Sequence, residues 1–336
     1  MAVYFCADGG GTKLLMLAFD EELRLLATAR GAGVSTLIAT PEQVKENMRD
    51  TLRQLIGSLP PEYRPAFGPL RVEKLFQTSC GTMAPAAVSD GLLEVGEVVR
   101  IGEGSCGVLA GLAAGTGVLA LSGTGSDCFY VQDTQRVAGV GGYGPILGDE
   151  GSGYDLGRQC LQAAIQADQE RGPATLLRDY VFEDYGLKES MWELVHIVHG
   201  SANYRTPVAR ATYTLARAAK DGDAVALDIL RRGGEQLASD TAALLRRIGQ
   251  DESCTLPATV SGGAWKIHPQ LWQSYTRSLR QRYPQLRISP PLFEPVMSGV
   301  IHHILHTEGA VSPDRLAQLK ENFAPYVLNR EYFAET

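Results

Sequence analysis

The first eighty residues alternate between short apolar runs and polar turns. Apolar runs at 3–7, 13–19 and 24–29 predict three strands, and the second is apolar on both faces, as expected for a central strand. A helix start follows at Pro41, with a threonine cap before it and apolar residues at helical spacing after it. Another strand is predicted at 72–78. These elements form a mixed α/β layer.

The opening pattern returns about a hundred residues later. The stretch GVLALSGTGSDCFYV (117–131) is again an apolar strand, a turn of small residues and a second strand, like the run from Phe5 to Thr12 and beyond. The repetition predicts two related α/β domains, each carrying a glycine turn. Chance similarity between two hairpins is the alternative.

The remainder of the chain is mostly helical. Long periodic stretches run from 208 to 249, and breaks are predicted at 220–224 and at Gly233–Gly234. The segment LPATVSGGAW (256–265) predicts a strand, a glycine turn and the start of a helix that continues through Leu271 and Tyr275.

Composition narrows the class of protein. A chain of 336 residues favours two domains, and a net charge of -7 argues against a nucleic-acid groove. Residues 104–126 carry no charge but hold seven glycines, which favours buried turns over a membrane span. Six cysteines without a CxxC pair, and no export signal, predict reduced thiols in the cytoplasm.

The stretch DGGGTK (8–13) is the first candidate for chemistry. It lacks the GxxxxGK[ST] order of a P-loop, and Leu14 stands where a dinucleotide fingerprint has its third glycine. A strand–turn–strand with three glycines can point consecutive N–H groups into one concavity and bind an anion. Asp8 at the mouth of the turn is placed to hold Mg²⁺ beside phosphates.

Two more segments complete the pattern. In SGGAW (261–265), a strand ends in glycines that let the backbone approach a ligand closely, although a plain strand-to-helix turn is the alternative. The stretch GVGGYGPILGDEGSGYDLG (139–157) precedes it. With DGGGTK and SGTGS, these motifs resemble the actin-like ATPase superfamily, and within it the N-acetylglucosamine kinase branch grouped with BadF/BadG-type ATPases.

The resemblance implies a fold and an organisation. The expected fold class is α/β, with two related actin-like (ribonuclease H-like) domains and a nucleotide and sugar cleft between them. We expect the N-terminal domain over 1–115 and the C-terminal domain over 116–322. The segment 323–336 is expected to pack back on the first domain.

The resemblance also assigns roles to matching positions. ATP would be bound at the three glycine turns by Gly9, Gly10, Gly11, Thr12, Lys13, Gly123, Thr124, Gly125, Gly262 and Gly263. The sugar would be bound by Ser126, Asp127, Gly142, Tyr143 and Asp149. The alternatives are a half-buried packing aromatic for Tyr143 and a helix cap for Asp149.

The chain departs from the family at two sugar-site positions. Leu37 stands where the family has an asparagine that touches the sugar. The family's catalytic aspartate, before the uncharged stretch, is missing, and Glu103 is the nearest carboxylate that could act as the base. The alternative is that Glu103 stabilises the start of a helix near Ser105.

Glu103 and Cys106 also reproduce a spacing found in activators of 2-hydroxyacyl-CoA dehydratases, where a cysteine binds an iron–sulfur cluster. The activators' second cysteine motif is absent from this chain, so no iron–sulfur cluster is expected. A buried structural thiol is the alternative for Cys106.

The resulting expectation is an ATP-dependent kinase that uses Mg²⁺ and phosphorylates an amino sugar such as N-acetylglucosamine, most often at the 6-hydroxyl. Its partners would be ATP and the sugar, with no nucleic acid or membrane, and a homodimer remains open. An ATPase activator of the dehydratase type and a catalytically inactive nucleotide or sugar sensor are the two alternatives.

Overall fold

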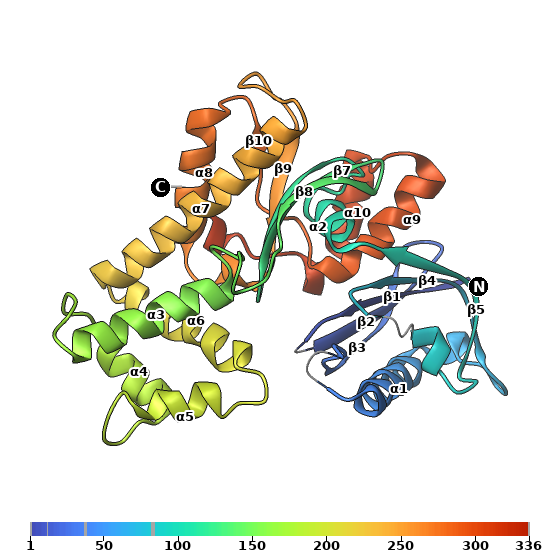
Figure 1. The fold of residues 1–336 in the computed structure, drawn as a ribbon. Helices are drawn as coiled ribbons and strands as arrows, with labels where there is room; N and C mark the ends of the chain where they lie inside the picture. The colour runs from blue at the N-terminus through green and yellow to red at the C-terminus, as the bar shows by residue number, and fades with distance from the viewer. Residues whose placement is uncertain (1, 12, 37–38, 82–84, 335–336) are drawn as a thin grey trace. The chain divides into compact units, whose positions relative to one another are not determined.

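The protein folds into two compact units. The structure is a computed structural model that describes residues 2–11, 13–36, 39–81 and 85–334 (Figure 1). The first unit comprises Met1–Thr116, Gln132–Arg136 and Pro291–Leu328, and the second comprises Gly117–Val131, Val137–Pro290 and Asn329–Thr336.

The first unit is built on a five-stranded sheet in the order β3-β2-β1-β4-β5. Strand β1 pairs antiparallel with β2 and parallel with β4. The strands are β1 (Val3–Gly9), β2 (Lys13–Asp20), β3 (Leu25–Ala32), β4 (Leu70–Thr78) and β5 (Leu93–Ile101). The sequence predicts the first four, but not the edge strand β5.

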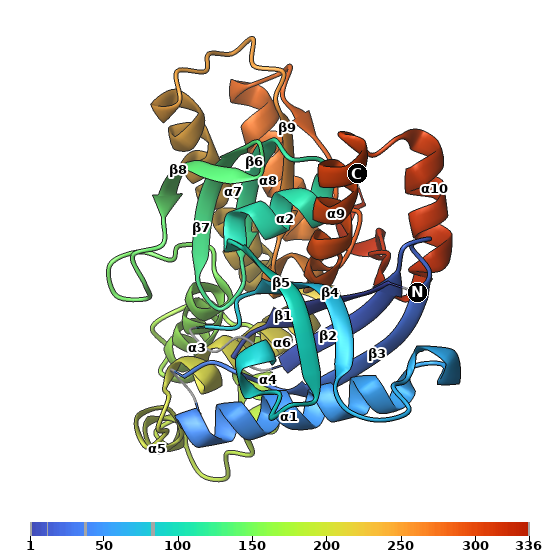
Figure 2. The same cartoon turned by 90° about the vertical axis from the view of Figure 1, so that its right-hand side faces the viewer.

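Helices cover both faces of this sheet (Figures 1 and 2). On one face lies α1 (Pro41–Ser58), which begins where the Thr40 hydroxyl accepts a hydrogen bond from the Gln43 N–H. Its buried stripe of Val44, Met48, Leu52 and Leu55 packs on the strands. The other face carries α2 (Glu103–Leu112), α9 (Ser298–Glu308) and α10 (Pro313–Asn322).

The chain returns to the first unit at Pro291 and leaves it after Leu328. The sequence places this return at Phe323, whereas the contacts place it earlier, because α9 buries Val300 and Ile301 against the sheet. The last residues, Asn329–Thr336, belong to the second unit. There Phe333 lies edge-on to Trp272, with ring centroids 5.4 Å apart.

The second unit repeats the architecture of the first. Its sheet has the order β10-β9-β6-β7-β8, so in both sheets the first strand is central, with the second and third strands on one side and the fourth and fifth on the other. The strands are β6 (Gly117–Ser122), β7 (Ser126–Gln132), β8 (Gln135–Gly141), β9 (Pro257–Ser261) and β10 (Arg287–Ile288). The prediction of two related α/β domains is confirmed.

The second unit is richer in helices. They are α3 (Gly153–Asp168), α4 (Leu177–Tyr185), α5 (Glu193–His199), α6 (Arg205–Lys220), α7 (Ala224–Arg247) and α8 (Pro269–Arg282). The predicted break at 220–224 separates α6 from α7, but the break at Gly233–Gly234 is wrong. Both glycines are buried inside α7. A Cβ at Gly234 would lie 2.9 Å from the Ser274 Cβ, so the glycines let α8 pack closely.

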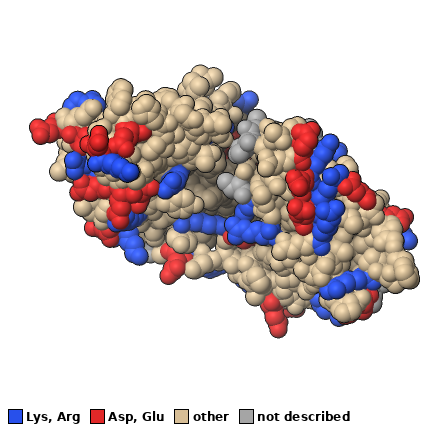
Figure 3. Space-filling view, turned by 90° about the horizontal axis from the view of Figure 1, so that it is seen from below, with Lys and Arg blue, Asp and Glu red and all other residues tan. Residues whose placement is uncertain are grey.

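Charged side chains of both signs share the surface. Figure 3 shows acidic and basic groups side by side on the face it displays. On α7, Arg231 pairs with Asp228 at 2.6 Å and with Glu235 at 2.7 Å. The six cysteines are buried free thiols. Within the described ranges, no helix combines the length and apolar character needed to cross a bilayer.

Candidate functional site

The first glycine turn closes the β1–β2 hairpin. Gly9 pairs with Leu14, and the Gly10 N–H donates to the Lys13 carbonyl at 2.9 Å. A Cβ at Gly9 would lie 2.6 Å from Val34 Cγ2, so only glycine fits there. Because the Gly10 N–H is used inside the turn, an anion would have to be met by N–H groups further along it. Gly11 is exposed, and Thr12 lies outside the described residues.

Asp8 is the penultimate residue of β1, next to this turn and near other carboxylates of the same unit. Burial raises the pKa of Asp8 to about 7. The charges of Glu294 and Glu103 add to this shift, while Lys13 opposes it. A cation bound next to this carboxyl would favour its ionised form and lower its pKa.

Glu103 is the first residue of α2, directly after Gly102 at the N-cap. Its side chain is exposed, yet the surrounding protein removes enough solvent to raise the pKa of its carboxyl, and Arg136 partly opposes this rise. A carboxylate in the first helical turn also stabilises the helix through its dipole. The geometry is therefore compatible with a base and with a helix-stabilising residue.

The second glycine turn closes the β6–β7 hairpin, which corresponds to the β1–β2 hairpin of the first unit. Ser122 pairs with Ser126, and the Gly123 N–H donates to the Gly125 carbonyl at 2.9 Å. The carbonyls of Gly123 and Thr124 accept hydrogen bonds from the first N–H groups of α3, at 2.8 and 3.3 Å. The turn is thereby fixed to the start of α3.

The GDEGS segment lies directly behind this second turn. The Ser122 hydroxyl donates to the Gly151 carbonyl, and the Ser126 hydroxyl to the Glu150 carbonyl, both at 2.8 Å. Ser126 therefore serves as a donor within the protein and could only accept a bond from a sugar. Between these anchors, Asp149 adopts the left-handed conformation, with φ of +61°, and is 4% exposed.

Asp149 does not cap α3, because Ser152 does so by accepting from the Asp155 N–H. Its carboxylate accepts a hydrogen bond from the Gly144 N–H at 3.2 Å. The other carboxylate oxygen lies 3.6 Å from Nη2 of Arg205, the first residue of α6. The buried Asp149 charge is thus balanced by an arginine.

The loop after β8 approaches Asp127 through glycines. The Gly142 N–H donates to the Ser126 carbonyl at 3.1 Å, and a Cβ at Gly142 would lie 2.5 Å from Asp127 Oδ2. Tyr143 follows with 75% of its surface exposed. This exposure disagrees with a half-buried packing aromatic and leaves the ring accessible to a ligand.

The third glycine turn lies against the second. Gly262 has φ of +110°, and a Cβ there would overlap the Ser122 carbonyl. Gly263 opens a short 3₁₀ helix, η3 (Gly263–Lys266), and α8 begins only at Pro269. The prediction that a long helix starts directly at the glycines is therefore wrong by several residues.

The expected residues thus form two groups, one in each unit. The first group consists of Asp8, Gly9, Gly10, Gly11, Lys13 and Glu103. The second consists of Gly123, Thr124, Gly125, Ser126, Asp127, Gly142, Tyr143, Asp149, Gly262 and Gly263. Leu37, like Thr12, lies outside the described residues.

Sequence reasoning missed three charged residues beside these groups: Glu294, Arg136 and Arg205. Arg205 offered a signal, because an arginine in the first turn of a helix sits at the unfavourable end of the helix dipole. Glu294 and Arg136 are distant in sequence from Asp8 and Glu103, the carboxyl groups whose pKa they influence, so no sequence pattern pointed to them.

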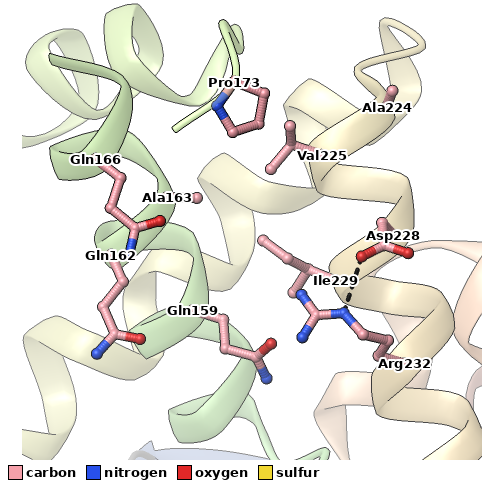
Figure 4. Close-up of a pocket in the computed structure, with 10 residues that line it drawn as sticks. All are labelled: Gln159, Gln162, Ala163, Gln166, Pro173, Ala224, Val225, Asp228, Ile229 and Arg232. Carbon is pink, nitrogen blue, oxygen red and sulfur yellow. Dashed lines mark hydrogen bonds and ion pairs between the residues drawn. The ribbon is translucent and has the colours of Figure 1, made fainter. Parts of the chain in front are cut away.

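A separate cavity of about 530 Å³ lies between α3 and α7 (Figure 4). It is lined by Gln159, Gln162 and Gln166 from α3, by Asp228 and Arg232 from α7, and by apolar residues such as Ile229. Its lining includes none of the expected nucleotide or sugar residues.

Comparisons with known proteins show the family of this chain and the fold that it shares with solved structures. Over residues 98–294, the chain matches the model of the BadF/BadG/BcrA/BcrD ATPase family. It is 25% identical over 291 residues to the N-acetylmuramic acid/N-acetylglucosamine kinase of Clostridium acetobutylicum, covering 84% of this chain and 91% of that one.

Two solved structures share the fold. One is a candidate N-acetylglucosamine kinase from Porphyromonas gingivalis, with a TM-score of 0.69, 17% identity, and coverage of 91% of this chain and 99% of that chain. The other is a ROK family glucokinase from Streptomyces griseus in complex with glucose and AMPPNP, with a TM-score of 0.54, 16% identity and coverage of 89% and 97%. Because the family model matches more than half of the residues of this chain, the chain belongs to the BadF/BadG/BcrA/BcrD ATPase family.

Proposed function

We propose that the protein is an ATP-dependent amino-sugar kinase that transfers the γ-phosphoryl group of ATP to a hydroxyl of N-acetylglucosamine or N-acetylmuramic acid. The observation that carries the proposal is the duplication of one sheet, with a glycine turn after the first strand of each copy. Phosphoryl transfer depends on positioning and charge stabilisation, which paired backbone turns can supply. The kinases named among the relatives support the same reading.

In this proposal the turn residues bind ATP. Gly11, Thr12 and Lys13 would meet the phosphates from the first unit, and Thr124 and Gly125 from the second. Gly262 and Gly263 would lie close to the rest of the nucleotide, because their backbone is not shielded by side chains.

Asp8 is the residue proposed to hold Mg²⁺. Among the described residues, no group of three His, Cys, Asp or Glu side chains could hold a metal by itself. A single carboxylate nevertheless suits Mg²⁺, which usually keeps several waters and binds phosphates together with one or two carboxylates. When bound, the ion would neutralise charge on the transferred phosphoryl group.

The sugar would be bound in the second unit, where Asp149 and Asp127 can accept hydrogen bonds from hydroxyls and Tyr143 can stack on the ring. Glu103 would accept the proton of the attacking hydroxyl, which we propose to be the 6-hydroxyl. Its raised pKa brings the carboxyl nearer to the operating pH of a general base.

Cys106 bears on the activator alternative. Burial raises the pKa of its thiol to about 12, and the Sγ–H donates to the Pro295 carbonyl at 3.4 Å. A cluster ligand must be a thiolate, so this setting favours a structural thiol.

The deciding experiment is ADP release, measured by a coupled assay with and without a panel of amino sugars. Release that requires N-acetylglucosamine or N-acetylmuramic acid is expected, and phosphorus–proton coupling in the product would locate the phosphate. Sugar-independent release would favour an ATPase activator. Binding of ATP and sugar without turnover would favour a sensor.

A further inference from the structure

The guanidinium of Arg205 stands beside the proposed sugar site with few bonds of its own. Its side chain approaches Asp149, with Nη2 3.6 Å from Asp149 Oδ2, which is longer than a direct hydrogen bond. Within the described part of the chain, its Nε is buried and has no hydrogen-bond partner. The side chain is 31% exposed, so the remaining nitrogen atoms can be reached.

The position of Arg205 at the start of α6 is unfavourable for the stability of that helix. It is the first residue of α6, where no acidic side chain occupies the first turn. A cation at this end is disfavoured by the helix dipole. A residue that breaks a local rule without a structural gain is a candidate for function.

Arg205 is also fixed next to the second glycine turn. Tyr204 before it packs edge-on to Tyr154 at 6.0 Å, and the Tyr154 N–H donates to the carbonyl of Thr124 in that turn. The Arg205 backbone is held by the Asn203 side chain, which accepts its N–H at 3.1 Å. The guanidinium is therefore presented from a fixed backbone, close to Asp149.

We propose that Arg205 forms a carboxylate subsite that binds an acidic substituent of an acetamido sugar, such as the lactyl group of N-acetylmuramic acid. A planar guanidinium suits a carboxylate, because two parallel N–H···O bonds can form. Asp149 Oδ2 lies 3.6 Å from Arg205 Nη2, too far for a direct hydrogen bond. The carboxylate of the sugar would accept hydrogen bonds from the guanidinium N–H groups that Asp149 does not use. The inference rests on the proposed sugar site.

The alternative is that Arg205 only neutralises the buried Asp149. The two roles differ in what they do to two sugars. If Arg205 only neutralises Asp149, its loss should weaken the binding of N-acetylglucosamine and N-acetylmuramic acid equally, because both sugars would contact Asp149. A carboxylate subsite serves only the acidic sugar, and it acts on binding far from the reacting hydroxyl, so it changes KM rather than kcat.

The test compares kcat and KM for both sugars in the wild-type protein and in Arg205→Met, Arg205→Lys and Arg210→Met. Arg210 is the matched control, because it lies on the same helix but donates to the Asp184 carbonyl and lies over the Tyr185 ring. The ratio of the two kcat/KM values cancels any loss that a displaced Asp149 causes for both sugars.

We expect Arg205→Met to lower the ratio for N-acetylmuramic acid over N-acetylglucosamine by about 10- to 100-fold, through KM. Arg205→Lys should recover part of this ratio, and Arg210→Met should leave it unchanged. An unchanged ratio in Arg205→Met would overturn the carboxylate subsite, as would a wild-type protein that accepts N-acetylglucosamine and does not bind N-acetylmuramic acid.

Calorimetric binding of N-acetylmuramic acid separates this inference from the proposed function. Binding that Arg205→Met weakens, in a protein that phosphorylates neither sugar, would support the subsite and refute the kinase. Turnover of both sugars with binding that does not depend on Arg205 would support the kinase and refute the subsite.

Discussion

The carboxylate of Asp149 lies against Gly125 of the second glycine turn, and a Cβ added to Gly125 would stand 2.7 Å from Asp149 Oδ2. Asp149 cannot swing away freely, because it is buried and bonded to the Gly144 N–H. The second glycine turn and Asp149 are therefore in direct contact within one unit.

This contact predicts the effect of Gly125→Ala. The added methyl group should displace the Asp149 carboxylate and raise the KM for sugar by about tenfold, the loss of roughly one hydrogen bond to a charged group. The measurement is the KM for sugar at saturating ATP. Gly57→Ala in α1 is the control, because a Cβ there meets nothing within 4 Å and the residue lies outside the proposed site. Equal KM values in the two variants would contradict the contact.

Glu103→Gln tests the proposed base. The substitution keeps the size of the side chain but removes the proton acceptor, so kcat should fall by about 10²- to 10⁴-fold. ATP affinity, measured by calorimetry, should stay within about twofold, because the change leaves the glycine turns proposed to bind ATP intact. Glu97→Gln, an exposed carboxylate of β5 that pairs with Lys74, is the matched control. Normal kcat in Glu103→Gln would remove Glu103 as the base.

Asp8 predicts a pH dependence of stability. Its pKa is about 7 in the folded protein, where burial raises it, and about 4 in an unfolded chain. Between these values the folded state binds more protons, so Asp8 makes the free energy of unfolding fall as pH rises from about 4 to 7.

The substitution Asp8→Asn should remove this dependence. It is expected to raise the free energy of unfolding by about 1–3 kcal/mol at pH 8, and the gain should vanish near pH 4. Calorimetric unfolding without Mg²⁺ at both pH values measures it, with Asp50→Asn on the exposed face of α1 as the control. A gain of equal size at both pH values would contradict the raised pKa.

The sequence predicts the strands that flank each glycine turn, because their apolar runs are buried in the sheets: β1, β2, β6, β7 and β9. It predicts the edge strand β3 but misses the edge strands β5, β8 and β10. Exposed Glu94, Glu97 and Gln135 interrupt the apolar pattern of β5 and β8, and β10 has only two residues. An edge strand whose apolar run is interrupted by exposed polar residues is hard to distinguish from a loop by composition.

The candidate site divides in the same way. The sequence predicts turns such as DGGGTK, because a run of glycines usually marks a place where the backbone comes close to another group. The sequence does not predict the pairing of Arg205 with Asp149, because the two residues lie in different parts of the chain. They meet only when α6 packs beside α3. Charge pairs between distant segments depend on tertiary packing, which local pattern does not encode.

The predicted helix break at Gly233–Gly234 failed for a physical reason that can be tested. Glycine costs about 1 kcal/mol relative to alanine in an exposed helix, and that cost suggested an interruption. In α7, Gly233 lies against Leu156 of α3 and Gly234 faces α8, where a Cβ would overlap the Leu271 carbonyl and lie 2.9 Å from the Tyr275 N. The close packing of the two helices offsets the cost of glycine.

Gly234→Ala should therefore lower the free energy of unfolding of the second unit by about 1–3 kcal/mol, because the methyl group must push α8 away from α7. Gly57→Ala in α1 is the matched control, since a Cβ there meets nothing within 4 Å and alanine favours the helix by about 0.5–1 kcal/mol. Denaturant unfolding followed by tryptophan fluorescence reports on the second unit, which contains Trp192, Trp265 and Trp272. If Gly234→Ala stabilised that unit as an ordinary helical alanine does, the close packing of α7 on α8 would be refuted.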